Sequence, residues 1–232
     1  RRRRLSQLAL PIGLADHAVF ASFLAAGNEA VVAHLEGVAR QRVTSGAWLA
    51  GGHASGKSHL LQAVCAAAGD SAAYLPAELL VPAGPGAIEG FAARTVLCID
   101  DIDRLAGLAE WERALFNLYN DMEVRGGQLV VTAAAPVRDT GFRLADLASR
   151  MSRLPSFVLQ TLADEDRMAA LRLRAAHRGL DLPEETARYL LTRTRRDMAS
   201  LYRVLDRLDR EALRAQRRLT VPFVRSVLDE SP

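Results

Sequence analysis

Eight consecutive residues, 51–58, constrain this chain more than any other feature. They read Gly-Gly-His-Ala-Ser-Gly-Lys-Ser and match the pattern G-x-x-x-x-G-K-[ST] at every position. The pattern follows an apolar segment, residues 48–50, that is typical of a strand, and it precedes a helical stretch. Glycines in this context let a loop wrap a phosphate, with backbone N–H groups pointing inward at the start of the helix. A chance glycine turn is the alternative, but the flanking strand and helix favour a phosphate-binding loop.

The motif predicts a contact for each residue of the loop. Lys57 is expected to reach the β- and γ-phosphates of ATP or ADP, and the Ser58 hydroxyl to bind Mg²⁺. All but one of the 30 lysine and arginine residues are arginines, and the exception is Lys57, where a compact ammonium is needed. The expected nucleotide contacts are Gly51, Gly52, His53, Ala54, Ser55, Gly56, Lys57, Ser58 and His59.

A second motif follows the apolar strand predicted at residues 96–99, which ends in Asp100 and Asp101. A carboxylate at the carboxyl end of a buried strand, beside a phosphate loop, is placed to hold Mg²⁺ through water. We expect Asp100 to take that role and Asp101 to polarise the attacking water. Strand-end solvation is the alternative, with Asp101 and Asp103 forming a turn.

Short apolar runs alternate with helical stretches over the first two thirds of the chain. Continuous hydrophobicity within each run is typical of parallel strands covered on both faces. The sequence therefore predicts a doubly wound α/β domain with a five-stranded parallel sheet. The expected strands are 47–50, 72–75, 96–100, 129–133 and 157–159, and the expected helices are 29–42, 57–68 and 110–125. Residues 76–85, with three prolines, are expected to form a flexible or extended loop.

After residue 160 the strand signals stop, and the pattern predicts only helices. These are expected at 164–178, from 183 onward, at 197–216 and at 220–228. The sequence thus predicts three parts: a peptide and linker at 1–15, a nucleotide-binding α/β domain at 16–160 and a helical domain at 161–232.

Charge and cysteine usage exclude several classes of protein. The net charge is +3, and without Arg1–Arg4 the chain has one more acidic than basic residue, which argues against a strongly basic nucleic-acid-binding body. No run approaches the roughly 20 apolar residues that span a bilayer. Cys65 and Cys98 lie in apolar segments and are expected to be buried thiols, as in a reducing cytoplasm.

Taken in order, these motifs resemble the AAA+ ATPases, and within them the clade of the bacterial replication initiator DnaA. The resemblance spans nearly the whole chain; it is carried by the phosphate loop, by the Asp100-Asp101 strand end and by residues 7–11, 20–23, 111–112, 118–120, 146–150 and 219–224. It implies an AAA+ P-loop fold with a C-terminal all-helical lid.

The resemblance also implies roles for three side chains. Arg150 corresponds to an arginine finger, which stabilises charge on a neighbouring subunit's γ-phosphate; an ordinary helix-end salt bridge is the alternative. Arg196 corresponds to the lid arginine that reaches back to the phosphates, with Arg195 a close competitor. Asn28 corresponds to the adenine-side turn, or else it is the N-cap of the helix that follows.

One position departs from the family pattern. A polar residue usually follows the fourth strand, where this chain has Ala134. A methyl group cannot orient a water or a phosphate, so we expect weak intrinsic hydrolysis at most and a stably held nucleotide, most readily ADP.

The N-terminal peptide resembles the short motif by which many replication proteins dock on the sliding clamp. Gln7 would bond at the pocket rim and Leu10 would fill an apolar slot, with Leu8, Pro11 and Ile12 beside it. A tail, or a strand packed on its own domain, is the alternative.

The expected function is that of a regulator of chromosome replication initiation. Docked on the DNA polymerase III sliding clamp, a bacterial cytoplasmic protein of this kind would stimulate ATP hydrolysis by DnaA through Arg150 and prevent re-initiation. DNA contact would be mainly indirect, through the clamp; a homodimer is compatible with the resemblance, and no membrane is involved. The alternatives are an initiator-like ATPase or a helicase loader acting directly at DNA, and a small-molecule P-loop kinase. An initiator is expected to carry a helix-turn-helix after the lid, and no such segment is expected between the lid and Pro232.

Overall fold

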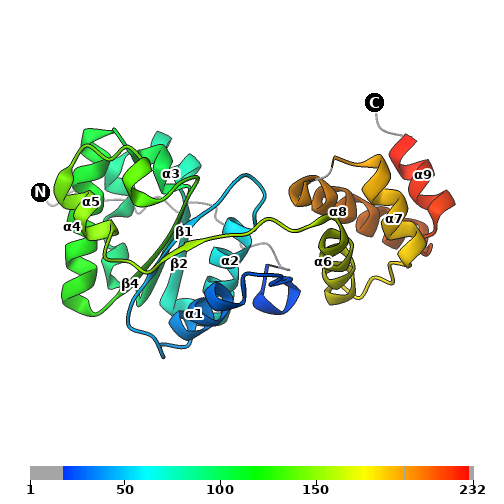
Figure 1. The fold of residues 1–232 in the computed structure, drawn as a ribbon, viewed down its shortest axis with the longest axis horizontal. Coiled ribbons are helices and arrows are strands. Elements are labelled where there is room, and N and C mark those ends of the chain that lie inside the picture. Colours follow the sequence, from blue (N-terminus) through cyan, green and yellow to red (C-terminus); the bar gives the residue numbers. More distant parts are fainter. Residues whose placement is uncertain (1–17, 196, 230–232) are drawn as a thin grey trace, which may run out of the picture.

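A computed structural model describes residues 18–195 and 197–229 of the chain. They form an α/β domain and a separate helical domain, joined by one extended segment that follows the last strand (Figure 1). None of the helices within the described ranges is long and apolar enough to cross a bilayer.

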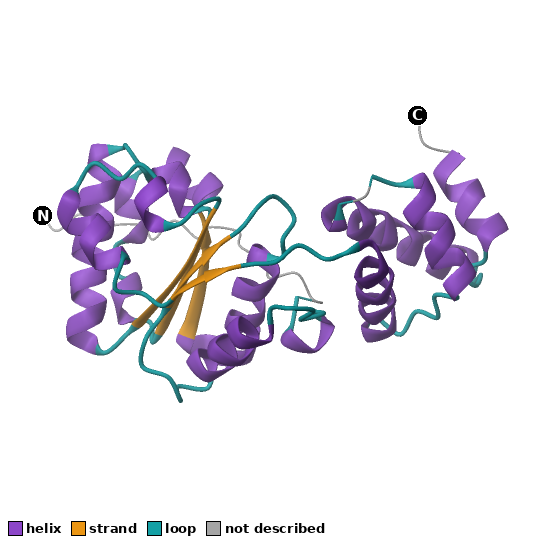
Figure 2. Ribbon diagram, viewed as in Figure 1, coloured by secondary structure: helices purple, strands orange, loops and turns teal. Residues whose placement is uncertain are grey.

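The α/β domain is built on a five-stranded parallel sheet in the order β2-β3-β4-β1-β5 (Figure 2). The strands are β1 (Ala47–Ala50), β2 (Ala72–Pro76), β3 (Val96–Asp100), β4 (Gln128–Ala133) and β5 (Ser156–Val158). All five predicted strands are confirmed. The order brings the carboxyl ends of β1, β3 and β4 side by side, because β4 pairs with both β1 and β3.

Helices cover both faces of the sheet, as the continuous hydrophobicity of its strands predicts. They are α1 (Glu29–Ala39), α2 (Lys57–Ala68), α3 (Ala77–Ala83), α4 (Ala109–Arg125) and α5 (Ala145–Met151). Successive side chains of a strand point to opposite faces. On β3, Leu97 and Ile99 join the core under α4, whereas Val96 and Cys98 join the core under α1 and α2. Cys65 and Cys98 are both buried, as predicted.

The prediction of a flexible or extended segment at residues 76–85 was wrong, because residues 77–83 form α3. Burial explains the difference: Ala77 and Leu80 are fully buried in the core of the sheet. Pro76 stands before the helix, and Pro82 lies in its last turn, so only one intrahelical hydrogen bond is lost. The chain ends the helix at Gly84, whose φ of +81° suits glycine.

The second domain contains helices and no strand within the described residues, which confirms the predicted change after residue 160. Its helices are α6 (Asp164–His177), α7 (Glu184–Arg193), α8 (Met198–Ala215) and α9 (Val221–Asp229). They enclose a core of their own, centred on Leu171, Leu190 and Leu205. The Asp197 carboxylate caps α8 by accepting a hydrogen bond from the Ser200 N–H at 2.8 Å.

Candidate functional site

A cavity of about 540 Å³ lies where the carboxyl ends of the strands meet the helical domain. Its size falls in the range of small-molecule and cofactor sites. One end is formed by the glycine-rich loop between β1 and α2; every predicted loop residue except Gly52 lines the cavity. Residues of α6 and α8 line the other end, so a bound ligand would contact both domains.

The loop is shaped to receive a phosphate. Gly56 has φ of +96° and stands directly before α2, whose first turn faces the cavity. A Cβ atom on Gly51 would meet the Ser55 Oγ at 2.7 Å, and one on Gly56 would meet the Phe23 ring at 2.6 Å. The Ser55 Oγ is buried and has no hydrogen-bond partner among the described residues. A loop this close-fitting, with an unpartnered hydroxyl at a helix N-terminus, fits a bound phosphate group.

Lys57 lies within this loop with only 9% of its surface exposed. Its Nζ donates to the Gly51 carbonyl at 2.7 Å and to the Gly52 carbonyl at 2.8 Å. These bonds hold the ammonium at the mouth of the loop, where a phosphate oxygen would replace a carbonyl as its partner. Ser58 is exposed on the first turn of α2 and lines the same cavity, so its hydroxyl is available to a cation.

The two aspartates at the end of β3 have different surroundings. Asp100 is 5% exposed and does not line the cavity. One of its oxygens accepts a hydrogen bond from the Tyr74 hydroxyl at 2.7 Å, and the other accepts from the Thr132 hydroxyl. Burial, reinforced by the Asp100 charge, raises the pKa of Tyr74 well above its usual range. Asp100 therefore stands behind the cavity wall, held by two hydroxyls.

Asp101 faces the cavity. It takes a left-handed conformation with φ of +54°, and its N–H donates to the Thr132 Oγ1 at 2.8 Å. Burial raises the pKa of the Asp101 carboxyl, as do the Asp100 and Asp103 charges, whereas Lys57 and Arg104 oppose the shift. A carboxyl with a raised pKa beside the phosphate loop can accept a proton, and polarising the attacking water stays a prediction for Asp101.

Asp103 and Arg104 also line the cavity, and sequence reasoning missed them as site residues. Both lie in the short helical turn after β3 (Ile102–Leu105). Their signal was their position just past a strand whose carboxyl end borders the phosphate loop.

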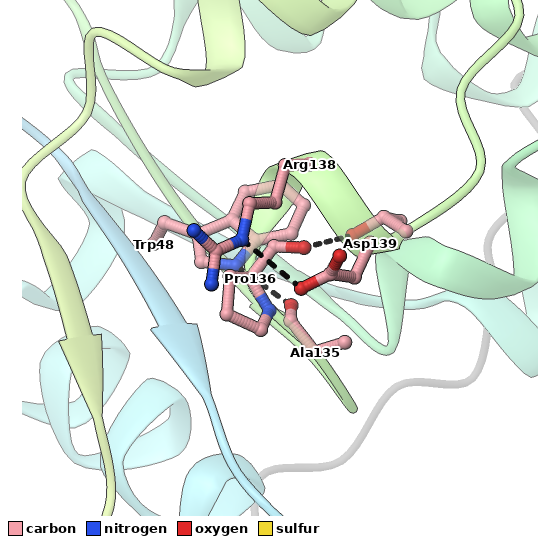
Figure 3. Close-up of polar contacts among 6 residues, drawn as sticks. Trp48, Ala135, Pro136, Arg138 and Asp139 are labelled. Carbon is pink, nitrogen blue, oxygen red and sulfur yellow. Dashed lines mark hydrogen bonds and ion pairs between the residues drawn. The ribbon is translucent and has the colours of Figure 1, made fainter.

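The turn after β4 places Ala134 at the cavity wall. Its neighbour Ala135 is fixed from β1, because the Trp48 indole N–H donates to the Ala135 carbonyl at 3.1 Å (Figure 3). Arg138 and Asp139, which follow in the same turn, pair with each other. Ala134, at the position where the family pattern has a polar group, therefore carries only a methyl group at the cavity wall.

Asn28 borders the cavity at the start of α1. It occupies the N-cap position, but its side chain makes no capping bond. Instead its Nδ2 donates to the Gln160 carbonyl at 3.1 Å, and its Oδ1 accepts from the Gln160 N–H at 2.9 Å. Asn28 thereby ties α1 to the segment that leads from β5 into the helical domain.

His59 lines the cavity but is already engaged by the protein. Its Nε2 lies 2.9 Å from the Val19 carbonyl, and its ring packs edge-on against Phe23 at 5.3 Å between centroids. Burial lowers the pKa of His59 to about 4, despite the Val19 hydrogen bond that opposes the shift. A neutral imidazole therefore fastens residues 19–23 onto α2, beside the cavity.

The buried imidazole makes the stability of the fold depend on pH. Because the pKa of His59 is lower in the folded than in the unfolded chain, unfolding takes up a proton below about pH 6.5. The contribution to the free energy of unfolding is present in full above pH 6.5 and is lost as the pH falls toward 4, up to about 3 kcal/mol. Urea unfolding at several pH values measures it. His59→Gln should flatten this dependence and the exposed His53→Gln should not; equal slopes in all three proteins would contradict the assignment.

The helical domain adds a cation that sequence reasoning also missed. Arg174 on α6 is 8% exposed and lines the cavity, stacked over the Tyr202 ring of α8. The signal was an arginine on the stripe of α6 that also carries Leu171 and Ala175, both buried. Arg196, the predicted lid arginine, lies outside the described residues, as do Gln7, Leu8, Leu10, Pro11 and Ile12.

Arg150 lies on the far side of the α/β domain from the cavity, which it does not line. It is in the last turn of α5, and its Nη1 is 3.2 Å from a carboxylate oxygen of Glu123, near the end of α4. Arg153 shares that carboxylate at 3.6 Å. These residues precede β4 and β5, so they lie at the amino edge of the sheet, opposite the phosphate loop. With 28% of its side chain exposed, Arg150 is accessible from outside.

Comparison with known proteins agrees with this geometry. Residues 164–228 match the model of the Hda lid domain family. The helical domain therefore resembles an Hda lid. The match covers all of α6 and α7 and most of the described helical domain, including Arg174 and Tyr202.

Solved structures resemble the chain over most of its length. Domain III of the replication initiation protein DnaA from Thermotoga maritima superimposes with a TM-score of 0.76 at 20% identity, over 94% of this chain and 98% of that one. AMPPCP-bound DnaA from Aquifex aeolicus superimposes with a TM-score of 0.68 at 19% identity, over 84% of this chain and 66% of that one. The T. maritima RuvB Holliday junction branch migration motor superimposes with a TM-score of 0.61 at 18% identity, over 88% of this chain and 69% of that one. The chain therefore has the AAA+ fold, and together with its Hda-type lid this agrees with an Hda-type member of the DnaA clade.

Proposed function

We propose that this DnaA-related AAA+ protein regulates the initiation of replication by stimulating ATP hydrolysis on DnaA while it is docked on the sliding clamp. The observation that carries the proposal is the position of Arg150. This arginine is accessible, and it lies at the edge of the sheet opposite the chain's own phosphate loop. A five-residue strand is about 17 Å long, so the guanidinium is far from that loop and suited to a site on another molecule.

The cavity is proposed to hold ADP or ATP with Mg²⁺. The close-fitting glycines, the buried Ser55 hydroxyl and Lys57 support a bound phosphate chain. Ser58 faces the cavity and would hold the cation, with Asp100 acting through water from behind the cavity wall, while Asp101 would polarise the attacking water. The cation would neutralise phosphate charge when bound. The A. aeolicus DnaA of similar fold binds the nucleotide analogue AMPPCP.

The bound nucleotide is proposed to serve as a structural ligand. Asp101 can accept a proton from water, but Ala134 offers no polar group to orient that water. Weak intrinsic hydrolysis follows, which favours a retained ADP that bridges the α/β domain and the lid. The stable arrangement of the two domains would then depend on the ligand, as a regulatory surface requires.

Docking on the clamp is assigned to the peptide that contains Gln7 and Leu10, on its resemblance to clamp-binding motifs. The proposal is tested by measuring DnaA ATP hydrolysis with this protein and with clamp loaded on DNA, omitting each in turn. Acceleration is expected only when all components are present.

Changing both Gln7 and Leu10 to Ala should abolish binding to the clamp and the acceleration that depends on it. ADP binding should be unchanged, because these residues precede the fold. Calorimetric titration measures both affinities. Loss of ADP binding together with clamp binding would contradict a separate docking peptide, and full acceleration without clamp would contradict the proposed role of docking.

A further inference from the structure

Arg174 is a buried cation that forms no ion pair within residues 18–195 and 197–229. It is 8% exposed, and its Nε is buried with no hydrogen-bond partner among the described residues. Its only contact of a polar kind within that part of the chain is with the Tyr202 ring, 4.2 Å from the guanidinium carbon. An aromatic face attracts a cation but accepts no in-plane hydrogen bond. The in-plane donors of Arg174 are therefore left for a group that is not part of the described chain.

The next arginine on the same face of α6 shows that the lid can supply partners. The side chain of Arg178 is largely buried, and its guanidinium pairs with Asp206 at 2.5 Å and lies 3.7 Å from Asp209, both on α8. No carboxylate in the described chain pairs with Arg174, one turn earlier, which lines the cavity instead. This difference points to a ligand in the cavity as the partner of Arg174.

The surroundings of Arg174 place it on the lid wall of the cavity. One turn before it on α6 is Ala170, and one turn before Tyr202 on α8 is Met198; both line the cavity. The charge of Arg174 also acts on His59, in the first turn of α2, so the guanidinium faces the α/β domain.

The cavity also has walls that suit a planar, apolar group. Ala170, Met198 and Tyr202 line it from the lid, and Phe23, which lies against Gly56, lines it from the α/β domain together with Leu24 and Leu162. A nucleotide with its phosphates in the glycine loop would place its base among these side chains. The edge of a base carries carbonyl oxygens and ring nitrogens that accept hydrogen bonds from a guanidinium.

We propose that Arg174, stacked on Tyr202, reads the base of the bound nucleotide and sets the base preference of this site. The proposal rests on the nucleotide site of the proposed function but not on the regulation of DnaA. The N–H groups of the Arg174 guanidinium would donate to acceptor atoms of the base when the lid packs over the nucleotide. The same contact would therefore also link the lid to the ligand.

The test compares the full chain with Arg174→Met, which keeps an unbranched apolar stem and removes every donor. Affinities are measured calorimetrically, with Mg²⁺, for ADP, GDP, CDP and inorganic pyrophosphate. Arg174→Met is expected to bind the nucleotide that the unchanged protein prefers about tenfold or more weakly. The differences in affinity among ADP, GDP and CDP are expected to become smaller. Pyrophosphate binding should change by less than about twofold, because it uses the loop alone.

Each other outcome overturns the assignment. A parallel loss for pyrophosphate would place Arg174 on the phosphates, and a loss with the same base preference would place it on the ribose. An unchanged protein that binds pyrophosphate but does not distinguish the bases would also contradict base reading. If the unchanged protein binds neither nucleotides nor pyrophosphate, the nucleotide site itself fails, while the regulation assay with DnaA stands apart from this result.

Two further variants separate recognition from folding. Arg172→Met changes an exposed arginine on the same helix and should leave all four affinities unchanged. Tyr202→Leu removes the stacking partner and should reduce base discrimination while Arg174 stays in place. Removal of a buried unpaired charge should not lower the melting temperature of the free protein. A large drop in the melting temperature of Arg174→Met, together with an unchanged base preference in Tyr202→Leu, would mean that Arg174 has a purely structural role.

Discussion

Replacing Arg150 with alanine is expected to abolish the acceleration of DnaA ATP hydrolysis by this protein. Arginine fingers contribute about 10³- to 10⁵-fold to hydrolysis rates in other NTPases, so the accelerated rate should fall to that of DnaA alone. Binding to the clamp and to ADP should not change, because Arg150 lies at the amino edge of the sheet, away from the cavity. Single-turnover hydrolysis by ATP-loaded DnaA, with clamp on DNA, measures the effect.

Arg153 is a matched control for this experiment. It lies three residues further on, is 58% exposed and shares the Glu123 carboxylate at 3.6 Å. Each of these exposed ion pairs contributes at most about 1 kcal/mol to folding, so both variants should fold normally. Arg153→Ala should retain most of the acceleration. Equal acceleration by Arg150→Ala and the unchanged protein would remove the proposed mechanism, and equal loss in both variants would indicate a general effect of surface charge.

Replacing Lys57 with alanine is expected to eliminate tight nucleotide binding. The ammonium is the cation within the loop, and a hydrogen bond between charged groups contributes about 1.5 to 3 kcal/mol. With two such contacts to the phosphates, ADP affinity should fall by at least about a hundredfold. Titration of the variant with ADP in the presence of Mg²⁺ measures the loss.

The control for Lys57 comes from outside the cavity. Arg172 is exposed on α6 and does not line the cavity, so Arg172→Ala should change ADP affinity by less than about threefold. The melting temperature of Lys57→Ala must be checked, since the ammonium also bonds the Gly51 and Gly52 carbonyls. Tight ADP binding by folded Lys57→Ala would mean that the cavity holds its ligand without the phosphate loop.

The sheet could be predicted from sequence because each of its strands is a short, continuously apolar run. Leu97 and Cys98 face opposite cores, so neither position tolerates a polar group and the pattern is clear. Residues 77–83 could not be predicted as a helix, because Pro76 and Pro82 are typical of loops. The helix forms because it buries Leu80. Local propensity is overridden there by packing.

The phosphate loop was equally readable, since its chemistry is contained in eight consecutive residues. The remainder of the site depends on contacts between segments far apart in the chain. The pairing of Asp100 with Tyr74 and Thr132 and the stacking of Arg174 on Tyr202 follow from the order of the strands and the packing of the lid helices. No local pattern encodes them.

The double hydrogen bond between Asn28 and Gln160 determines where rigid-body motion of the lid can start. These bonds hold the connecting segment on the α/β domain up to Gln160, and α6 begins at Asp164. The backbone angles of residues 161–163 are therefore the ones that a rotation of the lid would change first, and a few residues are enough for a hinge. A nucleotide spanning the two domains would then set the angle between them.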